Sequence, residues 1–221
     1  MEGVMERVRD PFLDILRRLV SLEGKKVLVV GCGKGEYAAQ IAAHCERLVG
    51  IDPNKKAIRV AIGRRIANAK FYRQKIQRAN LGKKKFDVVI FELSLHHVAE
   101  AEMAEAISRA IGLTKQDGHV VFLEPDTEGS FFQAEIKFGA CDGDERDAKE
   151  AAYLAMQKHP ALVLVEEVRD WVMILFDSID EFVASMRPQK ELHILESFLS
   201  KHNHFLKADI RINIYRRKPR P

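Results

Sequence analysis

Short, almost entirely apolar runs alternate with amphipathic segments along the first 125 residues of the chain. The apolar runs, each expected to be a buried strand, are 27–30, 48–51, 86–91 and 119–123. Apolar residues spaced three and four positions apart predict helices over 11–22, 37–46, 54–67 and 102–111. Fully buried strands that alternate with helices are typical of an α/β protein whose parallel sheet is covered on both faces.

The pattern changes after Pro125. Residues 126–160 are polar and charged, with a helical segment AKEAAYLAMQK near their end and no buried strand, so we interpret them as a helical cap inserted after the fifth strand. The cap is expected either to close over a substrate and exclude water or to mediate dimer contacts. Further elements are predicted as a weak edge strand over 71–76, a strand over 163–176, helices over 179–186 and 191–202, and a last strand over 210–215. We therefore expect one domain, 1–221, with a core at about 25–125, the cap at about 126–160 and completion of the sheet at about 161–216.

Composition narrows the class of protein only modestly. Hydrophobic residues make up 47% of the chain and charged residues 31%, which is ordinary for a globular domain. No apolar run approaches the roughly 18 residues that span a bilayer, and the N-terminus lacks the order of a secretory signal, so a cytoplasmic protein without a membrane partner is expected. Three cysteines without CxxC spacing suit reduced thiols better than a disulfide framework.

The formal net charge is +4, and part of the excess is clustered. Basic groups occur at Lys55-Lys56, Arg64-Arg65, Lys83 to Lys85 and Arg216 to Arg220. These groups are interpreted mainly as solvated faces and loops, with attraction of an acidic partner such as RNA as the alternative.

The segment VLVVGCGKGEYA, residues 27–38, carries the first chemical signal. Gly31, Gly33 and Gly35 follow the first predicted strand, where glycine allows the backbone to approach a ligand closely. Asp52 ends the second strand, 21 residues after Gly31, at a place where a carboxylate accepts hydrogen bonds from ribose hydroxyls. The spacing is GxGxG, and Glu36 stands where a dinucleotide fold needs a third small residue, which argues against NAD or FAD.

Four segments in this order resemble the class I S-adenosylmethionine-dependent methyltransferases, most closely their small-molecule branch. The segments are VLVVGCGKGEYA, LVGID, FDVVIFELSLHHVAE and GHVVFLEP, all within about residues 25–125. The resemblance implies a Rossmann-like doubly wound sheet of seven mostly parallel strands with an antiparallel last strand. It also implies S-adenosyl-L-methionine as the cofactor and a small molecule as the methyl acceptor.

The resemblance further implies which residues hold the cofactor. The backbone of Gly31, Cys32, Gly33 and Gly35 would approach its methionine and ribose parts, and Asp52 would bind both ribose hydroxyls. The remaining positions implied are Pro53 and the segment Gln74, Lys75 and Ile76 near the adenine, with Glu92 and Ser94 near the methionine part and the methyl group. We interpret the Cys32 side chain itself as a small apolar filler.

One position departs from the family pattern. Family members often carry a Gly-Asp pair whose carboxylate contacts the adenine amino group, and Gln74-Lys75 stands there instead. Lysine only donates hydrogen bonds, so Gln74 or Gln77 would have to supply the acceptor, or recognition would rest on backbone and packing. Weak cofactor binding and a non-catalytic methyltransferase-like protein are the alternatives.

His96, His97 and Glu124 are the candidate catalytic residues. A base is useful only where the acceptor must lose a proton, and histidine has a suitable intrinsic pKa. The alternative roles are loop capping and packing for the histidines and anchoring of a loop for Glu124. His193, His202 and His204 match no metal-binding spacing, so no metal is expected.

The acceptor is less closely defined than the cofactor. No Pro-Cys pair occurs, and the fourth strand is followed by Leu93-Ser94-Leu95 rather than a Pro-Pro-aromatic turn, which disfavours a nucleic-acid substrate. The expected partner is a small-molecule acceptor of a monomer or homodimer, with RNA- or protein-directed methylation as the alternative.

Overall fold

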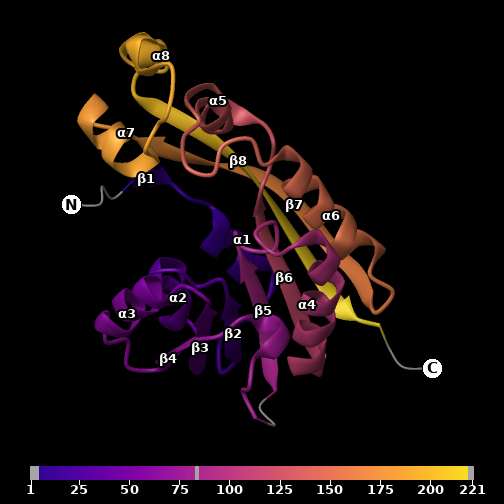
Figure 1. Cartoon of the computed structure of the whole chain (residues 1–221). Coiled ribbons are helices and arrows are strands. Elements are labelled where there is room, and N and C mark those ends of the chain that lie inside the picture. Colours follow the sequence, from indigo (N-terminus) through magenta and orange to yellow (C-terminus); the bar gives the residue numbers. More distant parts are fainter. Residues whose placement is uncertain (1–4, 83–84, 219–221) are drawn as a thin grey trace. The chain divides into compact units, whose positions relative to one another are not determined.

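The computed structural model describes residues 5–82 and 85–218, and the chain divides into two compact units (Figure 1). The larger unit comprises residues 12–124, 150–168 and the chain from 211 onward. The smaller unit comprises the chain up to residue 11 with 125–149 and 169–210. Two long strands, β7 (Leu162–Leu175) and β8 (Phe205–Arg217), contribute residues to both units.

The larger unit contains the alternating strands and helices that the apolar pattern predicts. Its elements are α1 (Phe12–Leu19), β2 (Lys26–Val30), α2 (Glu36–Ala42), β3 (Arg47–Asp52), α3 (Lys55–Gly63), β4 (Ala69–Arg73), η1 (Ile76–Arg78), β5 (Phe86–Glu92), α4 (Glu100–Leu113), β6 (Thr114–Pro125) and most of α6 (Arg146–Lys158). The strand order is β1-β7-β8-β6-β5-β2-β3-β4. Neighbours from β6 to β4 pair in parallel, so the carboxyl ends of β2, β3 and β5 meet at one edge.

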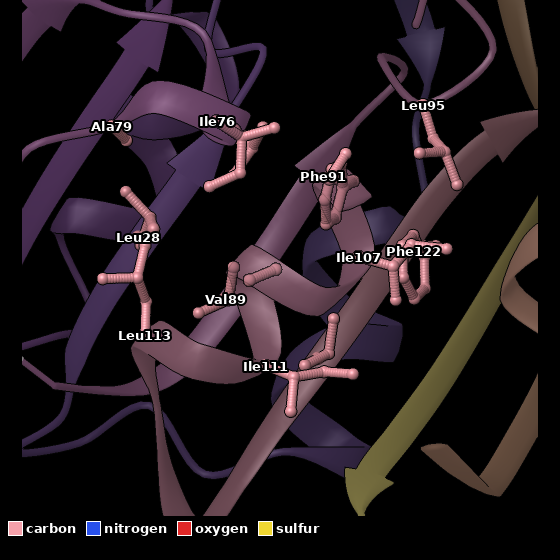
Figure 2. Packing of buried hydrophobic residues seen from close by; sticks show 14 of the residues in the cluster. Leu28, Ile76, Ala79, Val89, Phe91, Leu95, Ile107, Ile111, Leu113 and Phe122 are labelled. Atoms are coloured by element: carbon pink, nitrogen blue, oxygen red, sulfur yellow. The ribbon is translucent and has the colours of Figure 1, made fainter. Parts of the chain in front are cut away.

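The core of the larger unit follows from the two-residue period of its strands. Leu28, Val49, Val89 and Val120 belong to one buried cluster with the apolar face of α4, and Phe91 stacks on Phe122 at 4.9 Å between ring centroids (Figure 2). The alternate strand residues are also buried, including Val27, Val29, Val88, Ile90 and Val121. Side chains on both faces of the sheet are thus shielded from water, which confirms the expectation of a sheet covered on both sides.

The smaller unit contains β1 (Glu6–Arg9), α5 (Gly129–Phe138), the first turn of α6, α7 (Ile179–Met186), η2 (Leu192–Ile194) and α8 (Leu195–Lys201). An aromatic cluster holds its helices together. Phe138 meets Phe182 and Phe198 edge to face, with ring centroids 5.9 and 5.1 Å apart. Strand β1 pairs antiparallel with residues 173–175 of β7.

Several predicted boundaries were wrong. The helix expected over 37–46 ends at Ala42, because His44 N–H and Cys45 N–H donate to carbonyls three residues back and form tight turns. The strand expected over 71–76 ends at Arg73, and the helix expected over 191–202 begins as the short turn η2. Strand β1 was not expected, so the sheet formed by the described residues has eight strands rather than seven.

Part of the predicted basic surface lies outside the described residues. Lys83 and Lys84 of the lysine run and residues 219–221 of the tail belong to this part. Lys55, Lys56, Arg64 and Arg65 are described and are exposed at the two ends of α3. Among the described helices, none combines the length and the apolar character that crossing a membrane requires.

Candidate active site

The glycine turn after β2 is shaped by close packing against the loop after β5. Gly31 has φ of +73°, and a Cβ placed on it would lie 2.2 Å from Ser94 Cβ. The turn is also tied to β3, because Gly31 N–H donates to Ile51 O at 2.9 Å. Only glycine satisfies both the dihedral angle and the contact, so position 31 carries no side chain.

Asp52 is held rigidly at the end of β3. Its Oδ2 accepts a hydrogen bond from Gly33 N–H at 3.0 Å, and its Oδ1 accepts one from Asn54 N–H at 2.7 Å. A carboxylate offers about four lone-pair sites, so each oxygen retains one further acceptor site. The side chain is half-buried beside a cavity, and it is therefore a pre-oriented double acceptor for a pair of hydroxyl groups.

A cavity of about 580 Å³ lies wholly within the larger unit at the carboxyl ends of β2, β3 and β5. The sequence-predicted residues that line it are Gly31, Asp52, Pro53, Gln74, Lys75, Ile76, Ser94 and His97. Gln77, Val98, Ala99 and Glu102 also line it. Val98, Ala99 and Glu102 were not predicted, although the first two follow the LHH segment directly and Glu102 begins the helix predicted over 102–111, which was a usable signal.

Other predicted site residues are not part of the cavity wall. Cys32, Gly33, Gly35 and Glu92 do not line it. The Cys32 side chain is fully buried, and burial together with the carboxylates of Glu92 and Asp52 raises the pKa of its thiol above the usual range. A protonated, inaccessible thiol has no nucleophilic role, which agrees with the interpretation of Cys32 as a filler.

The wall near Lys75 offers an acceptor despite the lysine. Gln74 Oε1 accepts from Asn80 N–H at 2.7 Å and so caps its own loop. Gln77 Nε2 donates to Glu102 Oε2 at 2.9 Å, which fixes the orientation of the Gln77 amide. Lysine 75 itself is exposed. Gln77 and Glu102 thus bring amide and carboxylate oxygens to the cavity wall.

Glu124 anchors the loop that follows β5. Its Oε1 accepts from Ser94 N–H at 3.2 Å and Leu95 N–H at 2.8 Å, and its Oε2 accepts from His96 N–H at 3.4 Å. His96 Nδ1 also contacts Glu124 Oε2, and both side chains are buried. Ser94 Oγ completes the attachment by donating to Val30 O at 3.0 Å. Neither His96 nor Glu124 lines the cavity, whereas His97 does and is exposed.

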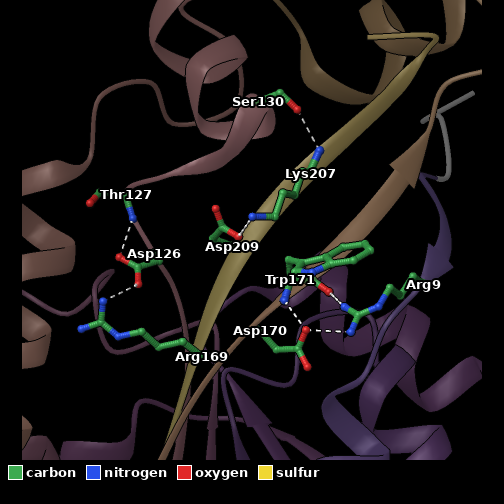
Figure 3. A network of polar contacts seen from close by, with 9 residues as sticks. All are labelled: Arg9, Asp126, Thr127, Ser130, Arg169, Asp170, Trp171, Lys207 and Asp209. Atoms are coloured by element: carbon green, nitrogen blue, oxygen red, sulfur yellow. Dashed lines mark hydrogen bonds and ion pairs between the residues drawn. The ribbon is translucent and has the colours of Figure 1, made fainter.

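A second polar cluster lies in the smaller unit around Trp171 (Figure 3). The Arg9 guanidinium lies 3.7 Å from the Trp171 ring centroid and pairs with Asp170 at 2.7 Å. Lys207 pairs with Asp209 at 2.7 Å. The contacts of Arg9 tie β1 to β7 within that unit, whereas the pair between Lys207 and Asp209 lies within β8.

Comparison with known proteins agrees with this geometry. A model of the methyltransferase domain matches residues 27–118. An uncharacterised methyltransferase of Mycobacterium tuberculosis is 29% identical over 166 residues, covering 73% of this chain and 82% of that protein. A ubiquinone biosynthesis O-methyltransferase of Alkalilimnicola ehrlichii is 34% identical over 110 residues, covering 47% of this chain and 43% of the enzyme.

The fold has solved counterparts as well. The N-methyltransferase NodS of Bradyrhizobium japonicum, in complex with S-adenosyl-L-homocysteine, superposes with a TM-score of 0.57 at 21% identity, covering 94% of this chain and 85% of that one. The fold, the glycine turn and the matched family model agree with one another. Residues 27–118 therefore match a methyltransferase domain, and the fold is shared with a solved methyltransferase that holds S-adenosyl-L-homocysteine.

Proposed function

We propose that the protein binds S-adenosyl-L-methionine in the cavity of the larger unit and transfers its methyl group to a small-molecule acceptor. The observation that carries the proposal is Asp52, whose two oxygens are each held by one backbone N–H and retain one acceptor site apiece. Two adjacent hydroxyls of a ribose match that pair of acceptors. The cofactor supplies a sulfonium-activated methyl group when it is bound.

The rest of the wall suits the other parts of the cofactor. The backbone of Gly31 lines the cavity, so a bound molecule can approach it closely. The Gln77 amide, oriented by Glu102, offers an acceptor for the adenine amino group in place of the carboxylate that Lys75 replaces. Ser94, in the loop after β5, lines the cavity and is proposed to lie near the methionine part, whereas Glu92, at the end of β5, does not line it.

His97 is the proposed general base for acceptors that must lose a proton. Of the three predicted catalytic residues, His97 is the one that lines the cavity, so its ring can reach a bound molecule. His96 and Glu124 are proposed instead to position the loop, because Glu124 accepts from three consecutive backbone N–H groups. The role of His97 is thus catalytic, and the other two act through the shape of the site.

A small acceptor is supported by the relatives and by what the loop after β5 lacks. The curated relative named above is described as an O-methyltransferase of ubiquinone biosynthesis, and NodS as an N-methyltransferase. The loop here reads Leu93-Ser94-Leu95 and has no prolines with which to hold a flipped base. Phenolic hydroxyls and amines are therefore the first acceptor classes to test.

Calorimetric titration with S-adenosylmethionine and S-adenosylhomocysteine tests the cofactor site. Asp52→Asn keeps an acceptor for one backbone N–H but loses the charge, and loss of charge-assisted bonds worth about 1–3 kcal/mol predicts roughly 5- to 150-fold weaker binding. Asp14→Asn, at an exposed position of α1, is the matched control and should bind as the parent does. Absence of binding by the folded parent would reject the proposal and favour a non-catalytic protein.

Transfer to the acceptor is tested separately with labelled cofactor and panels of phenols, amines and RNA. Turnover of a phenol or amine at a rate that His97→Ala lowers would support the proposal. Turnover of RNA alone, with a steep dependence on salt, would favour the nucleic-acid alternative.

A further inference from the structure

Positive charge is concentrated in the segment between Asp52 and Asp87. The segment contains twelve Lys and Arg residues and no Asp or Glu. Its formal charge is therefore +12 in a chain whose net charge is +4, so the rest of the chain is net acidic. A charge asymmetry of this kind within one stretch of sequence attracts an anionic partner.

The structure places most of these charges at one edge of the larger unit. Residues 55–78 form α3, β4 and η1; α3 contacts β4, and β4 is the last strand at its end of the sheet (Figure 1). Every basic residue of this range is exposed: Lys55, Lys56, Arg59, Arg64, Arg65, Lys70, Arg73, Lys75 and Arg78. In the described part of the chain, Arg64 pairs with Glu36 at 3.5 Å, and the other eight have no carboxylate partner. We call residues 55–78 the basic edge.

The exposed side of α3 combines basic with aliphatic side chains. Successive residues of a helix are turned by about 100°, so Ile62, Lys55, Arg59, Lys56 and Val60 follow one another around this side. All five are exposed, and the aliphatic pair is open to water to an unusual degree, at 56% for Ile62 and 45% for Val60. A helix with basic and apolar groups on its outer side is typical of proteins that bind membrane surfaces.

This combination fits an anionic lipid bilayer better than a nucleic acid. Acidic headgroups attract the basic side chains, while the aliphatic side chains of Val60 and Ile62 can leave water at the boundary with the acyl chains. A nucleic acid offers hydrated phosphates to those two side chains, and single strands are bound largely by stacking on aromatic residues. The aromatic residues of the basic edge are Phe71, which is buried, and Tyr72, which is half-buried.

We infer that the basic edge binds the surface of a membrane that contains anionic lipids. Such a contact is peripheral and needs no spanning segment, so it is compatible with the finding that no described helix could cross a bilayer. The expectation of no membrane partner concerned spanning runs and secretory signals, which a peripheral contact does not require. The inference is independent of the proposed methyl transfer, because it rests on residues outside the cofactor cavity such as Arg59 and Ile62.

Co-sedimentation of the full chain with lipid vesicles tests the inference. The parent should bind vesicles of phosphatidylcholine mixed with phosphatidylglycerol and not vesicles of phosphatidylcholine alone, and binding should weaken as salt is added. Failure to bind the anionic vesicles at low salt overturns the inference. Binding of a single-stranded or duplex RNA in place of the anionic vesicles overturns it as well and assigns the basic edge to a nucleic acid.

Charge variants locate the contact. Arg59→Glu should weaken binding to anionic vesicles at least fivefold, because one basic side chain near such a surface contributes about a factor of five. Lys158→Glu makes the same charge change at an exposed position of α6, which leads into β7, far from β4 in the strand order, and should stay within about twofold of the parent. Equal weakening by the two variants overturns the assignment to the basic edge.

The double variant Val60→Ser with Ile62→Ser tests the apolar part of the contact. It keeps every charge and should weaken binding to anionic vesicles several-fold, because two aliphatic side chains no longer leave water on binding. Circular dichroism checks that each variant is folded as the parent is. An unchanged affinity of the folded double variant overturns the choice of a bilayer as the partner.

Discussion

Replacement of Glu124 tests whether this residue builds the site or takes part in the chemistry. Its carboxylate holds the backbone of Ser94, Leu95 and His96 through three hydrogen bonds of 2.8 to 3.4 Å. Glu124 is 5% exposed, so water cannot easily replace the lost acceptors. Two variants, Glu124→Gln and Glu124→Ala, separate the loss of one oxygen from the loss of both.

The magnitude follows from which oxygen each variant keeps. Glutamine retains Oε1 for Ser94 and Leu95 but turns an amide donor toward His96 N–H, so about 1–2 kcal/mol of unfolding free energy should be lost. Alanine leaves the buried donors and His96 without their acceptor, and about 3–5 kcal/mol should be lost. Glu105→Gln and Glu105→Ala, at an exposed site of α4, should stay within about 0.5 kcal/mol of the parent.

Urea unfolding followed by circular dichroism measures these differences, and titration with S-adenosylhomocysteine measures the effect on the cavity. We expect affinity to fall in the same order as stability, because Leu93 and Ser94 of the anchored loop line the cavity. Equal costs for glutamine and alanine, or an alanine variant as stable as the Glu105 variants, would refute the anchoring role. An unchanged stability with lost turnover would instead assign Glu124 to the chemistry.

Three further changes have defined outcomes. Gly31→Ala should destabilise the protein by about 1–3 kcal/mol and abolish cofactor binding, because the Cβ of the alanine would lie 2.2 Å from Ser94 Cβ at a φ of +73°. Thermal unfolding measures the loss of stability, and calorimetry measures the loss of binding. His97→Ala should keep the parent stability and lower kcat by about 10²- to 10⁴-fold for an acceptor that must lose a proton, and an unaltered kcat would exclude a general base at this position. Burial raises the pKa of Glu135 to about 7 despite its partner Lys149. The folded state therefore binds this proton more tightly than the unfolded state does, so the free energy of unfolding should fall as pH rises from about 4.5 to about 7. Urea unfolding over this pH range measures the slope, and Glu135→Gln should flatten it. A slope that persists in the variant contradicts the role of Glu135.

The parts of the fold that were predictable from sequence are those set by local pattern. The runs at β2, β3 and β5 are apolar enough to identify buried strands, and the glycine turn with Asp52 locates the end of the sheet that carries the cavity. Strand β1 was missed because its four residues, ERVR, are exposed or half-buried in alternation and gain their order from pairing with β7 more than 160 residues away. A short stretch of sequence around β1 does not reveal a pairing partner that lies so far along the chain.

The site was predictable in position but not in its internal bonds. Glu124 was a candidate because it follows a strand, yet its anchoring role depends on the parallel register that sets Glu92 beside Leu123. The bond between Gln77 and Glu102 likewise joins residues 25 positions apart. The spacing of a motif indicates which residues approach a ligand, whereas the partner of each side chain is fixed by tertiary packing.

The contact between Gly31 and Ser94 has a consequence for how this protein can change over time. Because nothing larger than hydrogen fits at position 31 while a serine occupies position 94, drift at either site is constrained by the other. Ser94 also donates to Val30 O, so it cannot simply shrink without loosening the turn. Positions 31 and 94 can therefore change only together. A library of variants intended to change the acceptor preference would contain more folded members if it varied Val98 and Ala99, which line the cavity, and kept Gly31 and Ser94 unchanged.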